Sequence, residues 1–202
     1  MFLKKYLLRE KIKKNSYFVW NNEKKNIQIV KDSRILSLDL IIGIDYQKEI
    51  LTENTINFAK GNFTNNALLW CARGNGKSTL IKSVFNNSLF KYNNLKLIQL
   101  NKNNIFDIEG IYSSIGKFKQ FRFIIFIDDL SFEKIDSDYK IIKSTLDGSI
   151  HNQPTNILLY VTSNRRHLMP RDMIDNERSS AIHTDESVEE KISLTDRFGL
   201  WI

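Results

Sequence analysis

The sequence predicts an α/β fold with a mostly parallel, buried sheet between layers of helices. From residue 67 onward, short apolar runs alternate with stretches of helical spacing, and each run is continuous rather than alternately polar. Strands of that kind are buried on both faces and are joined by right-handed crossovers. The 202 residues and 42% apolar content fit one domain of this class.

The expected elements follow one another in regular alternation. The spacing predicts a first helix over residues 46–60, which ends at Gly61. Functional groups in parallel sheets collect where the strands end, at their carboxyl edge. Strands are expected at residues 67–71, 95–100, 123–128 and 157–161, and the later helices at residues 78–90, 103–117 and 139–146.

Cysteine content and hydropathy indicate the compartment. Cys71 is the single cysteine, so the chain has no internal disulfide and suits a reducing environment. No apolar run approaches the length of a membrane-spanning helix, and the basic N-terminus lacks a cleavage site. A cytoplasmic protein with no membrane span is expected.

The net charge of +7 is concentrated in residues 1–35, which we interpret as a basic N-terminal arm ahead of a domain over residues 36–202. The arm holds ten Lys or Arg and three acidic residues (10 − 3 = +7), while the remainder balances at 20 against 20. Three interpretations stay open. The arm is a solvated helix with Leu3, Leu7 and Leu8 inward, a contact for nucleic acid or an acidic protein partner, or a contact for a membrane surface.

Residues 71–78 read C-A-R-G-N-G-K-S and follow the first strand at the start of a helix. The pattern is close to the phosphate loop G-x-x-x-x-G-K-[ST], in which glycines with positive φ turn backbone N–H groups toward an anion. Lys77 is expected to reach the β- and γ-phosphates of ATP, and the Ser78 hydroxyl to bind Mg²⁺. The alternative is an ordinary glycine turn. The sequence thus predicts a P-loop NTPase, a three-layer sandwich, with nucleotide contacts from Ala72, Arg73, Gly74, Asn75, Gly76, Lys77, Ser78 and Thr79.

Cys71 departs from this pattern, because it stands at the position of the first glycine. If the backbone there needs positive φ, a non-glycine residue costs about 1–2 kcal/mol. If Cys71 only ends the strand, the cost is small.

Two carboxylates follow the apolar run F-I-I-F-I. Asp128 is expected to hold the hydrated Mg²⁺, and Asp129 to orient or deprotonate the attacking water, although Asp is one methylene shorter than the more usual Glu. Glu133 is a substitute candidate. The alternative is that one Asp caps the next helix or turn.

Asn164 ends the fourth strand in T-S-N. A neutral amide there can hydrogen-bond the γ-phosphate or the attacking water without competing for the metal. Asn is also common at strand ends and turns, so the order of the three segments carries the assignment as a γ-phosphate sensor.

These residues resemble the AAA+ ATPases and, more closely, the uncharacterised bacterial family called domain of unknown function 815. The similarity covers residues 38–202. It rests on L-I-I-G-I-D-Y-Q-K-E, L-L-W-C-A-R-G-N-G-K-S, I-D-D-L-S-F-E, T-S-N-R-R-H-L-M-P and E-E-K-I-S-L-T-D-R-F-G-L-W.

The resemblance implies further roles. Ile42 and Gly43 would lie beside the adenine, and Asn164 would be the first sensor. Arg197 is similar to the arginine finger that reaches the γ-phosphate of a neighbouring subunit, which implies a homo-oligomer. The alternative for Arg197 is a surface ion pair with an acidic residue, Glu189 or Glu190.

The resemblance also implies a five-stranded sheet with its fifth strand beside the phosphate-loop strand. In this sequence that strand is expected to be truncated, and the AAA+ helical lid to be absent. An exposed sheet edge and slow turnover by the chain alone are therefore expected.

The leading functional hypothesis is an ATPase that hydrolyses ATP with Mg²⁺ to remodel an unknown protein or nucleic-acid partner. The alternative is a nucleotide-binding switch or scaffold with little or no hydrolysis, favoured by Cys71, the short Asp129 and the missing lid. A small-molecule kinase is disfavoured by the T-S-N and D-R-F-G segments.

Overall fold

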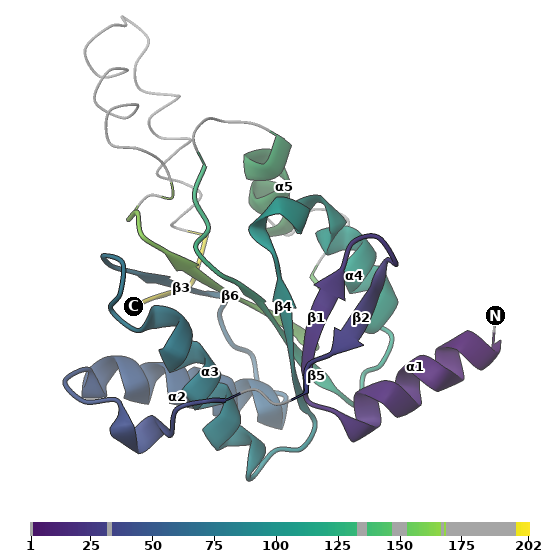
Figure 1. The fold of residues 1–202 in the computed structure, drawn as a ribbon, viewed down its shortest axis with the longest axis horizontal. Coiled ribbons are helices and arrows are strands. Elements are labelled where there is room, and N and C mark those ends of the chain that lie inside the picture. The colour runs from purple at the N-terminus through teal and green to yellow at the C-terminus, as the bar shows by residue number, and fades with distance from the viewer. Residues whose placement is uncertain (1, 32–33, 133–136, 147–152, 167, 169–196) are drawn as a thin grey trace, which may run out of the picture.

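A computed structural model describes residues 2–31, 34–132, 137–146, 153–166, 168 and 197–202. Its centre is a seven-stranded sheet in the order β2-β1-β4-β5-β6-β3-β7 (Figure 1). Neighbouring strands run parallel except β1 and β2, which form an antiparallel pair. The strands are β1 Tyr17–Asn21, β2 Asn26–Ile29, β3 Ala67–Trp70, β4 Leu95–Leu100, β5 Arg122–Ile127, β6 Ile157–Ser163 and β7 Leu200–Trp201.

Helices cover both faces of the sheet and give the expected three layers (Figure 1). Successive residues of β5 point to opposite faces: Ile124 and Phe126 pack with the helices α2 (Asp45–Lys60) and α3 (Lys77–Leu89). Ile125 and Ile127 pack on the other face, with α4 (Ile108–Ile115) and α5 (Ser137–Leu146). The continuous apolar run therefore reflects burial on both sides, as predicted.

The region expected as one helix over residues 103–117 is divided in two. A 3₁₀ segment, η2 (Lys102–Asp107), precedes α4 and contains Asn104 with non-helical φ and ψ of −115° and 22°. The Asn101 side chain accepts a hydrogen bond from the N–H of Asn103, which favours a tight turn over an α-helical start.

The predicted strand count of five is wrong, because residues 17–29 form a hairpin at the far edge of the sheet. β1 pairs with β4, with Phe18 opposite Ile98, and the alternate residues Phe18 and Trp20 are buried. This period-2 pattern lies within the segment interpreted as a basic arm. The hairpin adds two strands to the five that were expected, while the division of the chain at residue 35 stays a prediction.

The N-terminal helix α1 (Phe2–Lys14) agrees only in part with the interpretation of the arm as a solvated helix with three leucines inward. Ile12 is buried in the core and Leu8 is partly buried against it. Leu3 and Leu7 are 70% and 58% exposed, so the expectation that they point inward is wrong. The cause is geometric, because the first half of α1 projects from the β1–β2 side of the sheet (Figure 1).

The strand expected beside the phosphate-loop strand is present as β7. Its residues Leu200 and Trp201 pair with Ala67 and Leu68 of β3, and the N–H of Trp70 donates to the carbonyl of Ile202 at 2.9 Å. Among the described helices, none is long and apolar enough to cross a membrane.

Candidate functional site

The loop between β3 and α3 has the conformation that an anion-binding loop needs. Gly74 and Gly76 have φ of 82° and 75°, in the left-handed region that favours glycine. A Cβ added at either position would meet nothing within 4 Å, so the backbone conformation and not crowding requires glycine. The loop leads directly into α3, whose first N–H groups and dipole favour a negative group.

Cys71 occupies an ordinary backbone conformation in this loop. It is not among the described residues with positive φ. Its N–H donates to the carbonyl of Ser163 at 3.3 Å, which continues the pairing of β3 with β6 by one residue. Cys71 therefore only ends the strand, and the absence of a glycine at this position costs little backbone strain.

We predict that Cys71→Gly leaves nucleotide affinity within about twofold, since no strain exists for glycine to relieve. The greater freedom of the unfolded chain should lower the free energy of unfolding by about 0.5–1 kcal/mol. Urea unfolding and nucleotide titration measure the two quantities. A several-fold gain in affinity would show that Cys71 distorts the loop.

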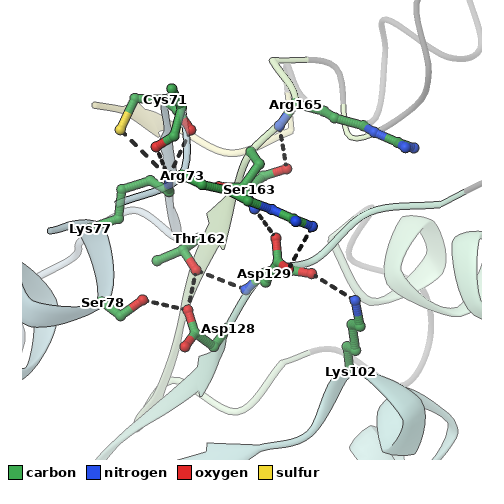
Figure 2. Close-up of polar contacts among 12 residues, drawn as sticks. Cys71, Arg73, Lys77, Ser78, Lys102, Asp128, Asp129, Thr162, Ser163 and Arg165 are labelled. Carbon is green, nitrogen blue, oxygen red and sulfur yellow. Dashed lines mark hydrogen bonds and ion pairs between the residues drawn. The ribbon is translucent and has the colours of Figure 1, made fainter. Parts of the chain in front are cut away.

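Lys77 is the first residue of α3, and its ammonium folds back over the loop (Figure 2). It donates to the carbonyls of Cys71 at 2.7 Å and Ala72 at 2.9 Å, and to Oδ1 of Asn164 at 2.9 Å. Its Nζ also lies 3.6 Å from the Cys71 sulfur. The ammonium is thus satisfied by neutral oxygens that an incoming anion can replace.

Ser78, Asp128 and Thr162 form a second cluster where β5 and β6 end (Figure 2). The Ser78 hydroxyl donates to Oδ1 of Asp128 at 2.5 Å, and the Thr162 hydroxyl donates to the same oxygen at 2.6 Å. The predicted metal residues Ser78 and Asp128 are therefore in direct contact. Hydroxyl and carboxylate oxygens are the donor types that Mg²⁺ accepts, with water completing its shell.

Asp129 is held in an unusual conformation beside this cluster. Its φ is 53°, a left-handed value that is uncommon for a residue other than glycine. Its N–H donates to the Thr162 hydroxyl at 2.9 Å, and its carboxylate accepts a hydrogen bond from the amide of Asn164. Arg73 reaches the other carboxylate oxygen at 4.0 Å. Backbone strain of this kind is typical of functional sites.

A cleft of about 380 Å³ brings most of the predicted residues together. Ile42 and Gly43 do not line it, and the Ile42 side chain is 87% exposed. Glu133 lies outside the described residues. The lining consists of Arg73, Gly74, Asn75, Gly76, Lys77, Ser78, Thr79, Asp128, Asp129, Thr162 and Asn164.

Arg197 lies at the opposite end of β3 from this cleft. It borders a separate depression with Asn65 and Asn66, which precede β3, whereas the phosphate loop follows β3. Gly199 contacts Asn65 so closely that a Cβ would lie 2.5 Å from the side-chain oxygen. Arg197 therefore faces away from the phosphate loop of its own chain. Glu189 and Glu190, the alternative partners, lie outside the described residues.

The sequence analysis gave no role to Thr162, which is 1% exposed and bonds to both aspartates. The signal was available, because Thr162 is two residues before Asn164 in the T-S-N segment, at the same end of β6. Only the tertiary structure places the ends of β5 and β6 next to each other.

Solved structures of AAA+ proteins have a similar fold. The Holliday junction branch migration motor RuvB of Thermotoga maritima has a TM-score of 0.51 at 19% identity, over 82% of this chain and 46% of that chain. PCH-2 of C. elegans has a TM-score of 0.51 at 16% identity, over 80% and 43%. DnaI has a TM-score of 0.51 at 16% identity, over 84% and 87%. This chain spans a little under half the length of the RuvB and PCH-2 chains.

The topology, the phosphate loop and these neighbours define an AAA+ P-loop NTPase fold, as the sequence predicted. The family described as "Protein of unknown function (DUF815)" matches residues 13–202, and the chain belongs to that family. Comparison with curated protein sequences finds no match.

Proposed function

We propose that this protein binds ATP with Mg²⁺ in the phosphate-loop cleft and hydrolyses it. One observation carries the proposal. The left-handed glycine loop, the Lys77 ammonium and the Ser78–Asp128 pair converge on one cleft at the carboxyl edge of the sheet. That combination of N–H donors, a cation and hard oxygen ligands suits a nucleoside triphosphate.

Binding of the phosphates exchanges one set of contacts for another. The β- and γ-phosphate oxygens take the place of the Cys71 and Ala72 carbonyls as acceptors for Lys77. Both carbonyls lie in a largely exposed loop, so water satisfies them after the exchange. The charged phosphate is the stronger acceptor, which favours the exchange.

Ser78 and Asp128 are the residues that would hold Mg²⁺, which when bound neutralises phosphate charge. Thr162 fixes the orientation of Asp128 by its hydrogen bond to Oδ1. Such a partner behind a metal ligand commonly affects metal affinity or activity by about 10–100-fold.

Asp129 and Asn164 are the residues that we assign to the attacking water. Asn164 joins Lys77 to Asp129, because its oxygen accepts from one and its amide donates to the other. A γ-phosphate bound to Lys77 competes for the Asn164 amide and thereby releases the Asp129 carboxylate to accept a proton from water. Hydrolysis is thus coupled to correct placement of the phosphate.

Completion of the site by Arg197 of a neighbouring subunit is also part of the proposal. The position of Arg197 at the amino edge of the sheet, opposite the phosphate loop, supports contact between chains over contact within one chain. Ile42 and Gly43 remain our candidates for the adenine contact, and the reducing cytoplasm our proposed compartment. The cycle would remodel a protein or nucleic-acid partner.

A nucleotide switch with little hydrolysis is the second candidate. It is favoured by the engagement of the Asp129 carboxylate with Asn164 and Arg73, because those contacts compete with a hydrogen bond from the attacking water. Calorimetric titration with Mg·ATP, together with phosphate release at increasing protein concentration, separates the two. Binding with turnover that rises with concentration supports the ATPase, whereas binding without turnover supports the switch. A folded sample that gives no binding heat contradicts both.

We predict that Thr162→Val raises the Mg²⁺ concentration needed for half-maximal turnover by about 10-fold or more. The loss of two buried hydrogen bonds should lower the free energy of unfolding by about 1–3 kcal/mol. Thr162→Ser keeps the hydroxyl and should restore the Mg²⁺ requirement. Thr55→Val removes another buried hydroxyl, which contacts Tyr160 at 2.8 Å, and controls for stability. An equal Mg²⁺ requirement in Thr162→Val and Thr55→Val would reduce Thr162 to a stabilising role.

A further inference from the structure

A basic trough lies between α1 and the segments that lead into β4 and β5. It consists of two adjoining depressions of about 330 and 380 Å³, which share Arg9 and Gln120. Because those segments precede their strands, the trough is at the amino edge of the sheet, opposite the phosphate loop. Its lining holds four cations, Lys5, Arg9, Lys13 and Lys117, and one carboxylate, Glu10.

Three of the cations form a row on α1. Lys5, Arg9 and Lys13 are four residues apart, which places them on one side of the helix at intervals of about 6 Å. All three are exposed, and within the described part of the chain none is paired with a carboxylate. A row of exposed cations at even spacing matches an extended chain of phosphates better than a single small anion.

A buried lysine adds positive charge behind the trough. Lys96 is 2% exposed, and its Nζ lies 5.4 Å from the ring centre of Phe121, which lines the trough. Its hydrogen-bond partner is the Ser16 hydroxyl at 3.5 Å, and no described carboxylate pairs with it. Burial lowers the pKa of Lys96, as expected for an ammonium without a counter-ion. A polyanion in the trough would supply that counter-charge.

The remaining lining can contact bases. Tyr6 is 53% exposed and borders the same depression as Lys5 and Arg9. Asn93 and Gln120 add exposed amides that can donate to sugar or base oxygens. Aromatic rings beside a basic groove are the usual means by which proteins bind unpaired bases.

We propose that the basic trough binds single-stranded nucleic acid, with the phosphates along the α1 row and a base stacked on Tyr6. The concave shape favours this partner over a membrane, since a lipid surface meets a convex or flat basic face. The exposed ring favours it over an acidic peptide, because the peptide has no base to stack. The trough shares no lining residue with the nucleotide cleft. Nucleic-acid binding in the trough and ATP binding in the cleft can therefore be tested independently.

The test is fluorescence anisotropy of the full chain with a labelled 20-nucleotide oligothymidine over a range of salt concentrations. The triple variant Lys5→Ala, Arg9→Ala, Lys13→Ala should bind roughly 10-fold or more weakly at moderate salt. The slope of log affinity against log salt should become shallower by about 2, since three phosphate contacts are lost. Tyr6→Ala should weaken binding with the slope unchanged.

The matched control is Lys24→Ala, Lys60→Ala, Lys140→Ala, which removes three exposed cations from other parts of the surface. Its affinity for oligothymidine should stay within about twofold of the wild type if the location of the cations, and not the net charge, determines binding. Equal weakening in both triple variants would overturn the proposal, as would tighter binding to polyglutamate or to anionic phosphatidylserine vesicles than to oligothymidine. Circular dichroism and thermal unfolding of the same variants verify that they are folded, and calorimetry with Mg·ATP then measures whether the nucleotide cleft is unaffected.

Discussion

Arg197→Ala should lower ATP turnover by roughly 10³–10⁵-fold, the range found for removal of an arginine finger, while Mg·ATP affinity stays within about twofold. The reason is positional. Arg197 and the phosphate loop lie at opposite ends of β3, so an arginine finger at Arg197 would act on the site of another chain. Phosphate release and nucleotide titration measure the two effects at protein concentrations that allow assembly.

Two further variants sharpen this test. Arg197→Lys keeps the charge but lacks the planar fork of donors, so it should recover only part of the rate. Lys60→Ala removes an exposed cation that, like Arg197, lies at the amino edge of the sheet, and it should leave turnover unchanged. Wild-type turnover in Arg197→Ala, or a rate per chain that is independent of protein concentration, would exclude the finger.

Lys77→Ala should reduce Mg·ATP affinity by about 100-fold or more, because the charged hydrogen bonds to the β- and γ-phosphates are lost. The fold should survive. Two of the three oxygens that Lys77 contacts are carbonyls of the exposed loop, which water can satisfy. Calorimetry measures the affinity, and circular dichroism and thermal unfolding verify the fold.

Lys82→Ala is the matched control for this change. Lys82 lies on the same helix but does not line the cleft; its ammonium is 5.6 Å from the ring centre of Phe126. The control removes the same charge and should keep full nucleotide affinity. If Lys77→Ala and Lys82→Ala bind Mg·ATP equally well, the loop is an ordinary turn and the proposed function fails.

Mixing the two disabled proteins connects both predictions. The Lys77→Ala variant keeps Arg197 but lacks the phosphate-binding lysine. The Arg197→Ala variant keeps the phosphate-binding cleft but lacks the proposed arginine finger. An equal mixture should recover roughly a quarter of the wild-type rate if subunits exchange at random in a head-to-tail assembly. No recovery, with assembly verified by light scattering, would argue that each chain completes its own site.

The sequence alone predicted the parts of the fold that depend on local pattern. The run F-I-I-F-I is buried on both faces, as its continuity implied, and Gly74 and Gly76 adopt the positive φ that the phosphate-loop pattern requires. The hairpin of residues 17–29 was missed, because its place in the sheet is specified by the pairing of β1 with β4, a partner far along the chain. The exposed basic residues around it also masked the alternation of Phe18 and Trp20.

For the candidate site, the sequence determined which residue types stand at the strand ends: Lys77 and Ser78 after β3, Asp128 and Asp129 after β5, and Asn164 after β6. Tertiary structure decided how they meet. Pairing of parallel strands brings Thr162 against both aspartates and gives Cys71 an ordinary strand-end conformation. It also places Arg197 at the amino edge of the sheet, opposite the phosphate loop. Composition and spacing indicate which chemical groups each segment carries. Hydrogen bonds between strands that are distant in the chain determine which of these groups share one cleft.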